Sequence, residues 1–102
     1  NPLAYGHTLV VPRDEIDQWI DVPPDLQQHL FEVAHRIGVA QKQAFGSNRI
    51  GMTIAGFEVP HMHIHLIPAN AMSDMDFALA SDSVDTADIK KAAESIKSSL
   101  EN

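Results

Sequence analysis

The 102-residue sequence has the length of one globular domain, and it carries a strongly acidic charge balance. Seven Lys and Arg stand against 14 Asp and Glu, a formal net charge of −7, which disfavours broad electrostatic binding to nucleic acid or to an anionic membrane. The sequence has no Cys, which excludes a disulfide framework and a Cys-based zinc site within it. It also has no apolar run near the roughly 20 residues that cross a bilayer. We therefore expect a cytoplasmic protein whose partners include neither nucleic acid nor a membrane.

The first half of the chain predicts a strand followed by a long helix. Residues 8–12 are β-branched and apolar, which is typical of a strand. The mixed segment 13–20 predicts a short helical turn with Ile16, Trp19 and Ile20 on one side. A helix is predicted over 24–45, because two prolines suit its first turn, apolar residues recur at helical spacing and a glycine follows.

The second half predicts two strands and a final helix. Apolar alternation predicts strands at 48–55 and 61–68, joined by a short turn, and therefore an antiparallel pair. An irregular acidic segment follows, and a helix over 87–100, capped by Thr86, is predicted with its apolar stripe at Ile89, Ala92 or Ala93, Ile96 and Leu100. This order favours the α+β class over a doubly wound parallel sheet.

The most informative stretch alternates three histidines with apolar residues, from His61 to Leu66. Successive side chains of a strand point to opposite faces, so His61, His63 and His65 should share one face, roughly 7 Å apart. Met62, Ile64 and Leu66 should form the opposite face, packed in the core. Imidazole titrates near neutral pH and serves as nucleophile, general acid or base, or metal ligand.

Three interpretations of this row compete. A surface strand with incidental histidines explains a single histidine better than three in strict alternation. A metal site would use two of them with a distant carboxylate, because the outer pair lies roughly 13 Å apart on a strand and all three cannot easily converge on one ion. Covalent catalysis, with His63 as the nucleophile and its neighbours orienting it or stabilising charge, is the interpretation that we favour.

The run from His61 to Ile67 resembles the His-φ-His-φ-His-φ-φ signature of the histidine triad (HIT) proteins, which are nucleotide hydrolases and transferases. The upstream segment from Pro2 to Pro12 is similar to the Pro-x-x-x-Gly-His-x-Leu-Val-x-Pro strand of that family, and the resemblance extends from residue 1 to about residue 68. It implies a HIT-like fold, in which a long helix packs on an antiparallel sheet, and a homodimer.

The resemblance also implies a role for individual residues. His63 would attack the α-phosphorus of a nucleotide and form a nucleotidyl-histidine intermediate. His65 would hydrogen-bond the phosphate or the leaving group, and His61 would support the nucleophile. His7 matches a fourth histidine near the site, and Leu9 matches a position that lines the nucleoside pocket.

The segment before the triad matches the family in part. Gly56 would present a backbone amide to phosphate, and Val59 keeps the apolar residue of the family pattern. Phe57 and Glu58 stand where many members have Gln and then Thr or Ser. Glu58 either tunes a histidine or a leaving-group amine, or points to solvent. The preference for a leaving group is therefore left open by these two positions.

The activity that the resemblance implies is hydrolysis or transfer at the α-phosphate of a purine nucleotide, with nucleoside phosphoramidates as the substrate class. No organic cofactor is implied, and a metal is possible but not required. The alternatives are a dinucleoside polyphosphate hydrolase or phosphorylase of the same fold, a nucleotide-binding protein with little catalysis, and a metal-binding strand protein. Because family members carry about forty further residues before the segment that begins at Pro2, we expect residues 1–102 to be the C-terminal two-thirds of a single HIT domain.

Overall fold

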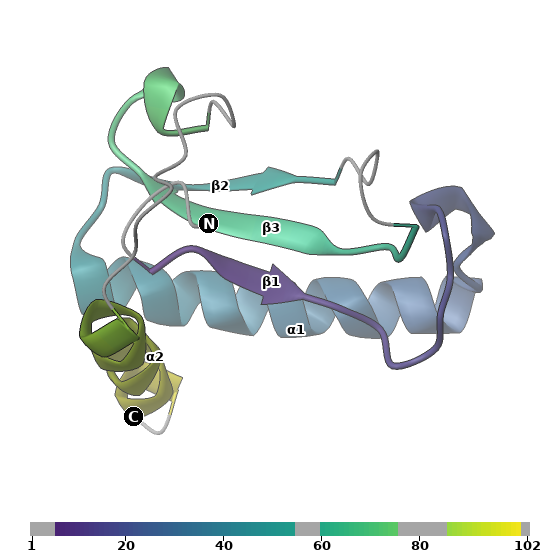
Figure 1. Ribbon diagram of the computed structural model, residues 1–102, viewed down its shortest axis with the longest axis horizontal. Helices are drawn as coiled ribbons and strands as arrows, with labels where there is room; N and C mark the ends of the chain where they lie inside the picture. The colour runs from purple at the N-terminus through teal and green to yellow at the C-terminus, as the bar shows by residue number, and fades with distance from the viewer. Residues whose placement is uncertain (1–5, 55–59, 76–85, 101–102) are drawn as a thin grey trace.

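The computed structural model describes residues 6–54, 60–75 and 86–100. In these residues a three-stranded sheet lies over one long helix, and a second helix crosses the end of the first (Figure 1). The elements, in chain order, are β1 (Thr8–Val10), the 3₁₀ helix η1 (Trp19–Asp21), α1 (Pro24–Phe45), β2 (Arg49–Thr53), β3 (Ile64–Ala69), the 3₁₀ helix η2 (Met72–Met75) and α2 (Thr86–Leu100). No helix in the described ranges is both long and apolar enough to cross a membrane.

The sheet has the strand order β1-β3-β2, and both pairings are antiparallel. His65 on the central strand faces Leu9 on β1 and Thr53 on β2. β3 is the central strand of the sheet, and every one of its residues is buried. The predicted α+β class and the predicted antiparallel pair of strands are confirmed.

The core lies between the sheet and α1. Met62, Ile64 and Leu66 are 3%, 0% and 1% exposed, which confirms the core face that the alternation predicted. They pack with apolar residues of α1 and β1: Val10, Leu30 and Ala34 belong to the same cluster. Because this cluster holds α1 against one face of the sheet, the odd-numbered side chains of β3 are directed to the other face.

Helix α1 has the bounds that the sequence predicts. Pro24 occupies its first turn, where the missing amide hydrogen costs no hydrogen bond. Gly46 ends it with φ of 61°, in the left-handed region, and its amide donates to the carbonyl of Lys42.

The strands are shorter than predicted, and the reason lies in competing hydrogen bonds. β3 begins at Ile64 and not at His61, since the amide of Met62 donates to the carbonyl of Ile16, 2.6 Å away, instead of joining the sheet. β1 likewise ends at Val10, and the carbonyl of Pro12 is bound by a side chain. β2 covers Arg49–Thr53 of the predicted 48–55.

Two predicted apolar faces are narrower than expected. The helical turn predicted in segment 13–20 forms at Trp19–Asp21. Ile16 packs on the core, whereas Trp19 and Ile20 are 52% and 61% exposed, so the prediction that the three side chains share one side is wrong. On α2, Ala92 and Ile96 are buried, but Ile89 and Leu100 at its two ends are exposed. The described part of α2 packs mainly against the end of α1 that leads into β2, which is too short a contact to cover the whole stripe (Figure 1).

Candidate active site

The imidazole rings of His63, His65 and His7 form a row, called the histidine row from here on, on the sheet face that α1 does not cover. The rings of His63 and His65, two residues apart on the same side of the chain, meet edge to face with their centroids 4.7 Å apart. The ring of His65 meets the ring of His7 at 5.1 Å. His7 immediately precedes β1, so the antiparallel pairing of β1 with β3 brings together residues that are 58 positions apart in the sequence.

His63 is held in one tautomer by the chain that precedes it. Its Nδ1 lies 2.7 Å from the backbone carbonyl oxygen of His61. A carbonyl only accepts hydrogen bonds, so Nδ1 carries the hydrogen and the lone pair of the neutral ring is at Nε2. This is the arrangement that a nucleophilic imidazole requires.

His65 and His7 form a neutral pair. Nε2 of His7 lies 2.9 Å from Nδ1 of His65, so one of the two nitrogens donates to the other. Burial, and then the nearby His65, lower the pKa of His7 to about 4. Burial, and then the nearby His63, also lower the pKa of His65. When His7 donates, Nε2 of His65 carries a hydrogen and is a donor; when His65 donates, its Nε2 is an acceptor. The pair can therefore present either a hydrogen-bond donor or an acceptor at this atom.

His61 is tied to a different part of the chain. Its Nε2 donates to the carbonyl oxygen of Pro12, 2.9 Å away, which fixes the residue beside the end of β1. Its backbone carbonyl accepts the hydrogen bond from His63. His61 thus supports His63 through its backbone, which sequence alternation alone did not indicate.

The remaining predicted site residues divide into two groups. Leu9 lies opposite His65 in the sheet and is 51% exposed, so its side chain is available to a ligand on this face. Gly56, Glu58 and Val59 lie outside the described residues, as does Phe57. Their predicted contacts with phosphate or with a histidine stay predictions.

Gln41 is a buried residue beside the candidate site that the sequence analysis missed. It is fully buried on α1, and its amide nitrogen contacts the backbone carbonyl of Gly6, just before β1, and that of Leu66 on β3, behind the histidine row. A signal was present: Gln41 is a polar residue four positions after Ile37 and seven after Ala34, within the apolar stripe of the helix.

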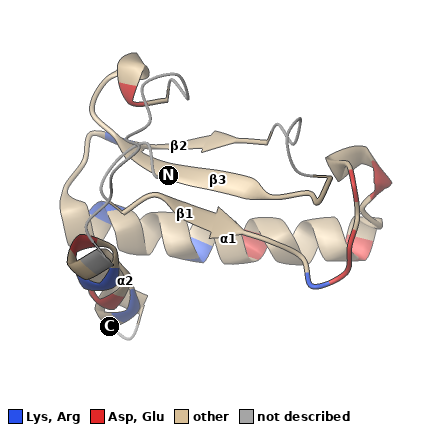
Figure 2. Cartoon of the chain, in the orientation of Figure 1, with Lys and Arg blue, Asp and Glu red and all other residues tan. Residues whose placement is uncertain are grey.

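The charge around the row is low. Strands β1 and β3 carry no Lys, Arg, Asp or Glu, and the charged residues of the described chain lie mainly on the helices and on the loop before η1 (Figure 2). In the described ranges no group of three or more His, Asp or Glu side chains is placed to hold a metal ion. A phosphate on the described part of this face would thus meet imidazoles and no charged residue of β1 or β3.

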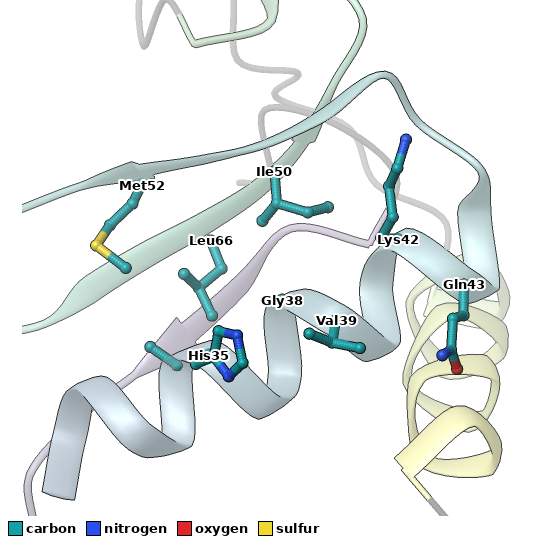
Figure 3. Close-up of a pocket in the computed structure, with 9 residues that line it drawn as sticks. His35, Gly38, Val39, Lys42, Gln43, Ile50, Met52 and Leu66 are labelled. Atoms are coloured by element: carbon teal, nitrogen blue, oxygen red, sulfur yellow. The ribbon is translucent and has the colours of Figure 1, made fainter. Parts of the chain in front are cut away.

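A second feature, an apolar groove, lies on the other side of the sheet, between α1 and β2 (Figure 3). Its volume is about 470 Å³, and its lining includes Gly38, Val39, Ile50 and Met52. The side chains of Val39 and Met52 are almost half exposed. The groove includes none of the three rings, so it is separate from the histidine row.

Comparison with known proteins shows which family the sequence matches. The HIT domain family matches residues 1–72. An uncharacterized HIT-like protein of Borreliella burgdorferi is 33% identical over 75 residues, which cover 67% of this chain and 54% of that protein. An asymmetrical bis(5'-nucleosyl)-tetraphosphatase of Schizosaccharomyces pombe is 29% identical over 72 residues, which cover 66% of this chain and 40% of that protein. The chain thus spans about half the length of such curated relatives, or less.

The fold matches solved structures over nearly its whole length. The crystal structure of a hypothetical histidine triad nucleotide-binding protein from Sulfolobus tokodaii superposes with a TM-score of 0.81 at 21% identity. The superposition covers 99% of this chain and 73% of that protein. At this level of identity the match shows the fold, and the local geometry must carry the chemistry.

Proposed function

This chain belongs to the HIT domain family, and from that premise we propose that it is a nucleotide hydrolase or transferase that acts at the α-phosphate of a purine nucleotide. The observation that carries the proposal is the hydrogen bond from Nδ1 of His63 to the carbonyl of His61, which leaves the lone pair at Nε2. A neutral imidazole fixed in this tautomer beside two further neutral histidines is suited to covalent catalysis.

The reaction proceeds in two steps. In the first, Nε2 of His63 attacks the α-phosphorus; a P–N bond forms, the bond from phosphorus to the leaving group breaks, and the leaving group takes a proton. In the second, water or another acceptor attacks the same phosphorus, the P–N bond to His63 breaks, and the acceptor loses its proton. We assign both proton transfers to His65, which contacts the ring of His63 and is hydrogen-bonded to His7: it passes a proton taken from solvent to the leaving group, and it later takes the proton of the acceptor and returns it to solvent.

A nucleoside phosphoramidate is the substrate class that this pair suits best. Its leaving group is an amine, a strong base that must be protonated as the P–N bond breaks. His65 can pass on a proton that it has taken from solvent, and the pair is neutral again when the amine leaves. A dinucleoside polyphosphate is the second candidate, and it is favoured by the similarity to the tetraphosphatase of S. pombe. Turnover of an adenosine phosphoramidate compared with a dinucleoside tetraphosphate separates the two.

The proposal includes a homodimer formed through the groove between α1 and β2. In the described sheet β2 is an edge strand, with β3 on one side only. Apolar residues line the groove beside it, and a bare sheet edge next to an apolar groove is a surface that a second copy of the chain covers by pairing strands and burying side chains. Sedimentation analysis with the variant Met52→Asp, which places a charge at this surface, tests the dimer.

The decisive experiment traps the covalent intermediate. Protein is mixed with a slowly leaving AMP ester, and the added mass of the nucleotidyl group is located by peptide mass spectrometry. We expect it on His63 and expect no adduct in His63→Ala, with hydrolysis lower by about 10³-fold or more. His29→Ala, which removes an exposed histidine of α1, is the control. An adduct on His61 or His65 contradicts the assignment of the nucleophile. If the protein binds AMP but the rate of hydrolysis is unchanged in His63→Ala, the proposed enzymatic activity is contradicted and a nucleotide-binding protein is favoured.

A further inference from the structure

We propose that Gln41 is a positioning residue that sets the hydrogen bond between His7 and His65. The inference deepens the proposed function and rests on it, since it concerns the pair that exchanges protons in that reaction. Gln41 is fully buried in α1, on the opposite side of the sheet from the imidazole rings. Its hydrogen bonds go to Gly6, Thr8 and Leu66 and to neither ring, so we argue that it acts on the pair through the backbone.

The side-chain amide of Gln41 contacts both strands of the pair. Its Nε2 lies 2.9 Å from the carbonyl oxygen of Gly6, 3.0 Å from that of Leu66 and 3.3 Å from Oγ1 of Thr8. Backbone carbonyls only accept, so the nitrogen end of the amide must face them, and the orientation of the amide is settled by its surroundings. One amide thus bridges the start of β1 and the middle of β3.

The residues that it binds adjoin the two histidines. Gly6 and Thr8 flank His7 in the chain, and Leu66 directly follows His65. The ladder between β1 and β3 begins at Thr8, so it does not include His7. Gly6 has φ of 88°, in the left-handed region, where the chain turns before the strand. Gln41 therefore ties the residue that precedes His7 to the residue that follows His65.

A small shift of His7 is enough to break the pair. The distance between the two ring nitrogens is 2.9 Å, and hydrogen bonds of this kind have donor–acceptor distances of about 2.7–3.2 Å. A movement of β1 by roughly half an ångström therefore takes the contact out of range. Without it, the tautomer of His65 is no longer coupled to that of His7, and a change at Nε2 of His65 can no longer be matched by His7.

The other end of the Gln41 amide indicates that packing alone does not explain the residue. Its Oε1 is buried and has no hydrogen-bond partner within the described ranges. A buried polar atom without a partner costs about 1–3 kcal/mol. An apolar side chain of similar length would avoid that cost but could not bind the carbonyls of Gly6 and Leu66. The site thus keeps a donor at the expense of an unpaired acceptor, which fits a positioning role.

The test replaces the donor and keeps the length of the side chain. Gln41→Met is compared with Gln28→Met, which makes the same change at an exposed position of α1. Ring nitrogen shifts, measured by NMR on the full chain, report the tautomers of His7 and His65 without any substrate. We expect Gln41→Met to change these shifts, because the two rings no longer share a hydrogen, and Gln28→Met to leave them as in the original protein. Unchanged shifts in folded Gln41→Met overturn the proposal.

Kinetics give a second, independent arm. We expect Gln41→Met to lower kcat about tenfold with KM nearly unchanged, and to have no further effect when His7 is already replaced by Gln. An equal loss of kcat with and without His7 overturns the proposal, because Gln41 would then act elsewhere. If Gln41→Met does not fold, Gln41→Asn, which keeps the amide one methylene short of its acceptors, takes its place with the same two outcomes. If the protein turns over no nucleotide at all, the proposed function fails, whereas the NMR arm still decides the role of Gln41.

Discussion

The lowered pKa of His7 predicts that the protein loses stability when the pH falls from 7 to 5, and that His7→Gln reduces this loss. In the unfolded chain a histidine has a pKa of 6.5, whereas His7 in the fold has a pKa of about 4, because burial and then His65 disfavour its charged form. Between these two values the unfolded chain binds a proton that the folded chain does not. Stability is therefore full above pH 6.5 and falls as the pH drops toward 4.

The magnitude follows from the same two values. A group with these pKa values contributes a loss of about 2 kcal/mol at pH 5 relative to pH 8. The ring of His7 keeps partial contact with water, so we discount this to about 1 kcal/mol. His65 acts in the same direction, since burial and His63 also lower its pKa. Gln in place of His7 should therefore remove about 1 kcal/mol of the loss and leave a smaller slope.

Urea unfolding at pH 7.5 and at pH 5 measures both quantities. This range stays above the pH at which ordinary carboxyl groups take up protons, so that the histidines dominate the change. His29→Gln, on the exposed side of α1, is the control and should lose as much stability as the original protein. If His7→Gln loses as much as His29→Gln, or if the original protein gains stability on acidification, the account of the buried neutral pair is wrong.

Two further predictions concern glycines. Gly6→Ala should destabilise the fold by about 2 kcal/mol or more, because its φ of 88° suits glycine and an added Cβ would collide with the ring of Phe45. Gly46→Ala, where φ is 61° but nothing lies near the new Cβ, should destabilise the fold less. Equal losses of stability in urea unfolding would contradict the predicted collision with Phe45. Gly51→Ala should also destabilise the fold, by about 1–3 kcal/mol, because its Cβ would collide with the thioether of Met75. Adding Met75→Ala to the same chain should recover most of that loss of stability. No recovery would show that the collision is not with Met75.

Local patterns in the sequence determined the long helix, the buried face of the central strand and the histidine motif. The helix at 24–45 followed from prolines at its start, helical spacing and a closing glycine, all of which act within one turn of the chain. The buried face of Met62, Ile64 and Leu66 followed from the two-residue period of extended chain. The histidine motif itself was sufficient to indicate the family that the comparisons establish.

Only the tertiary structure decided which hydrogen bonds the histidines form. The tautomer of His63 depends on the rotation of the chain that aims the carbonyl of His61 at its ring, and the bond from His7 to His65 depends on the register of two strands 58 residues apart. The tie from Gln41 requires a helix placed against both strands at once. The residue types and their spacing indicate which chemical groups are present to form a site. Hydrogen bonds between distant segments have no local signature, because their distances and angles are set only when the sheet and the helix pack together.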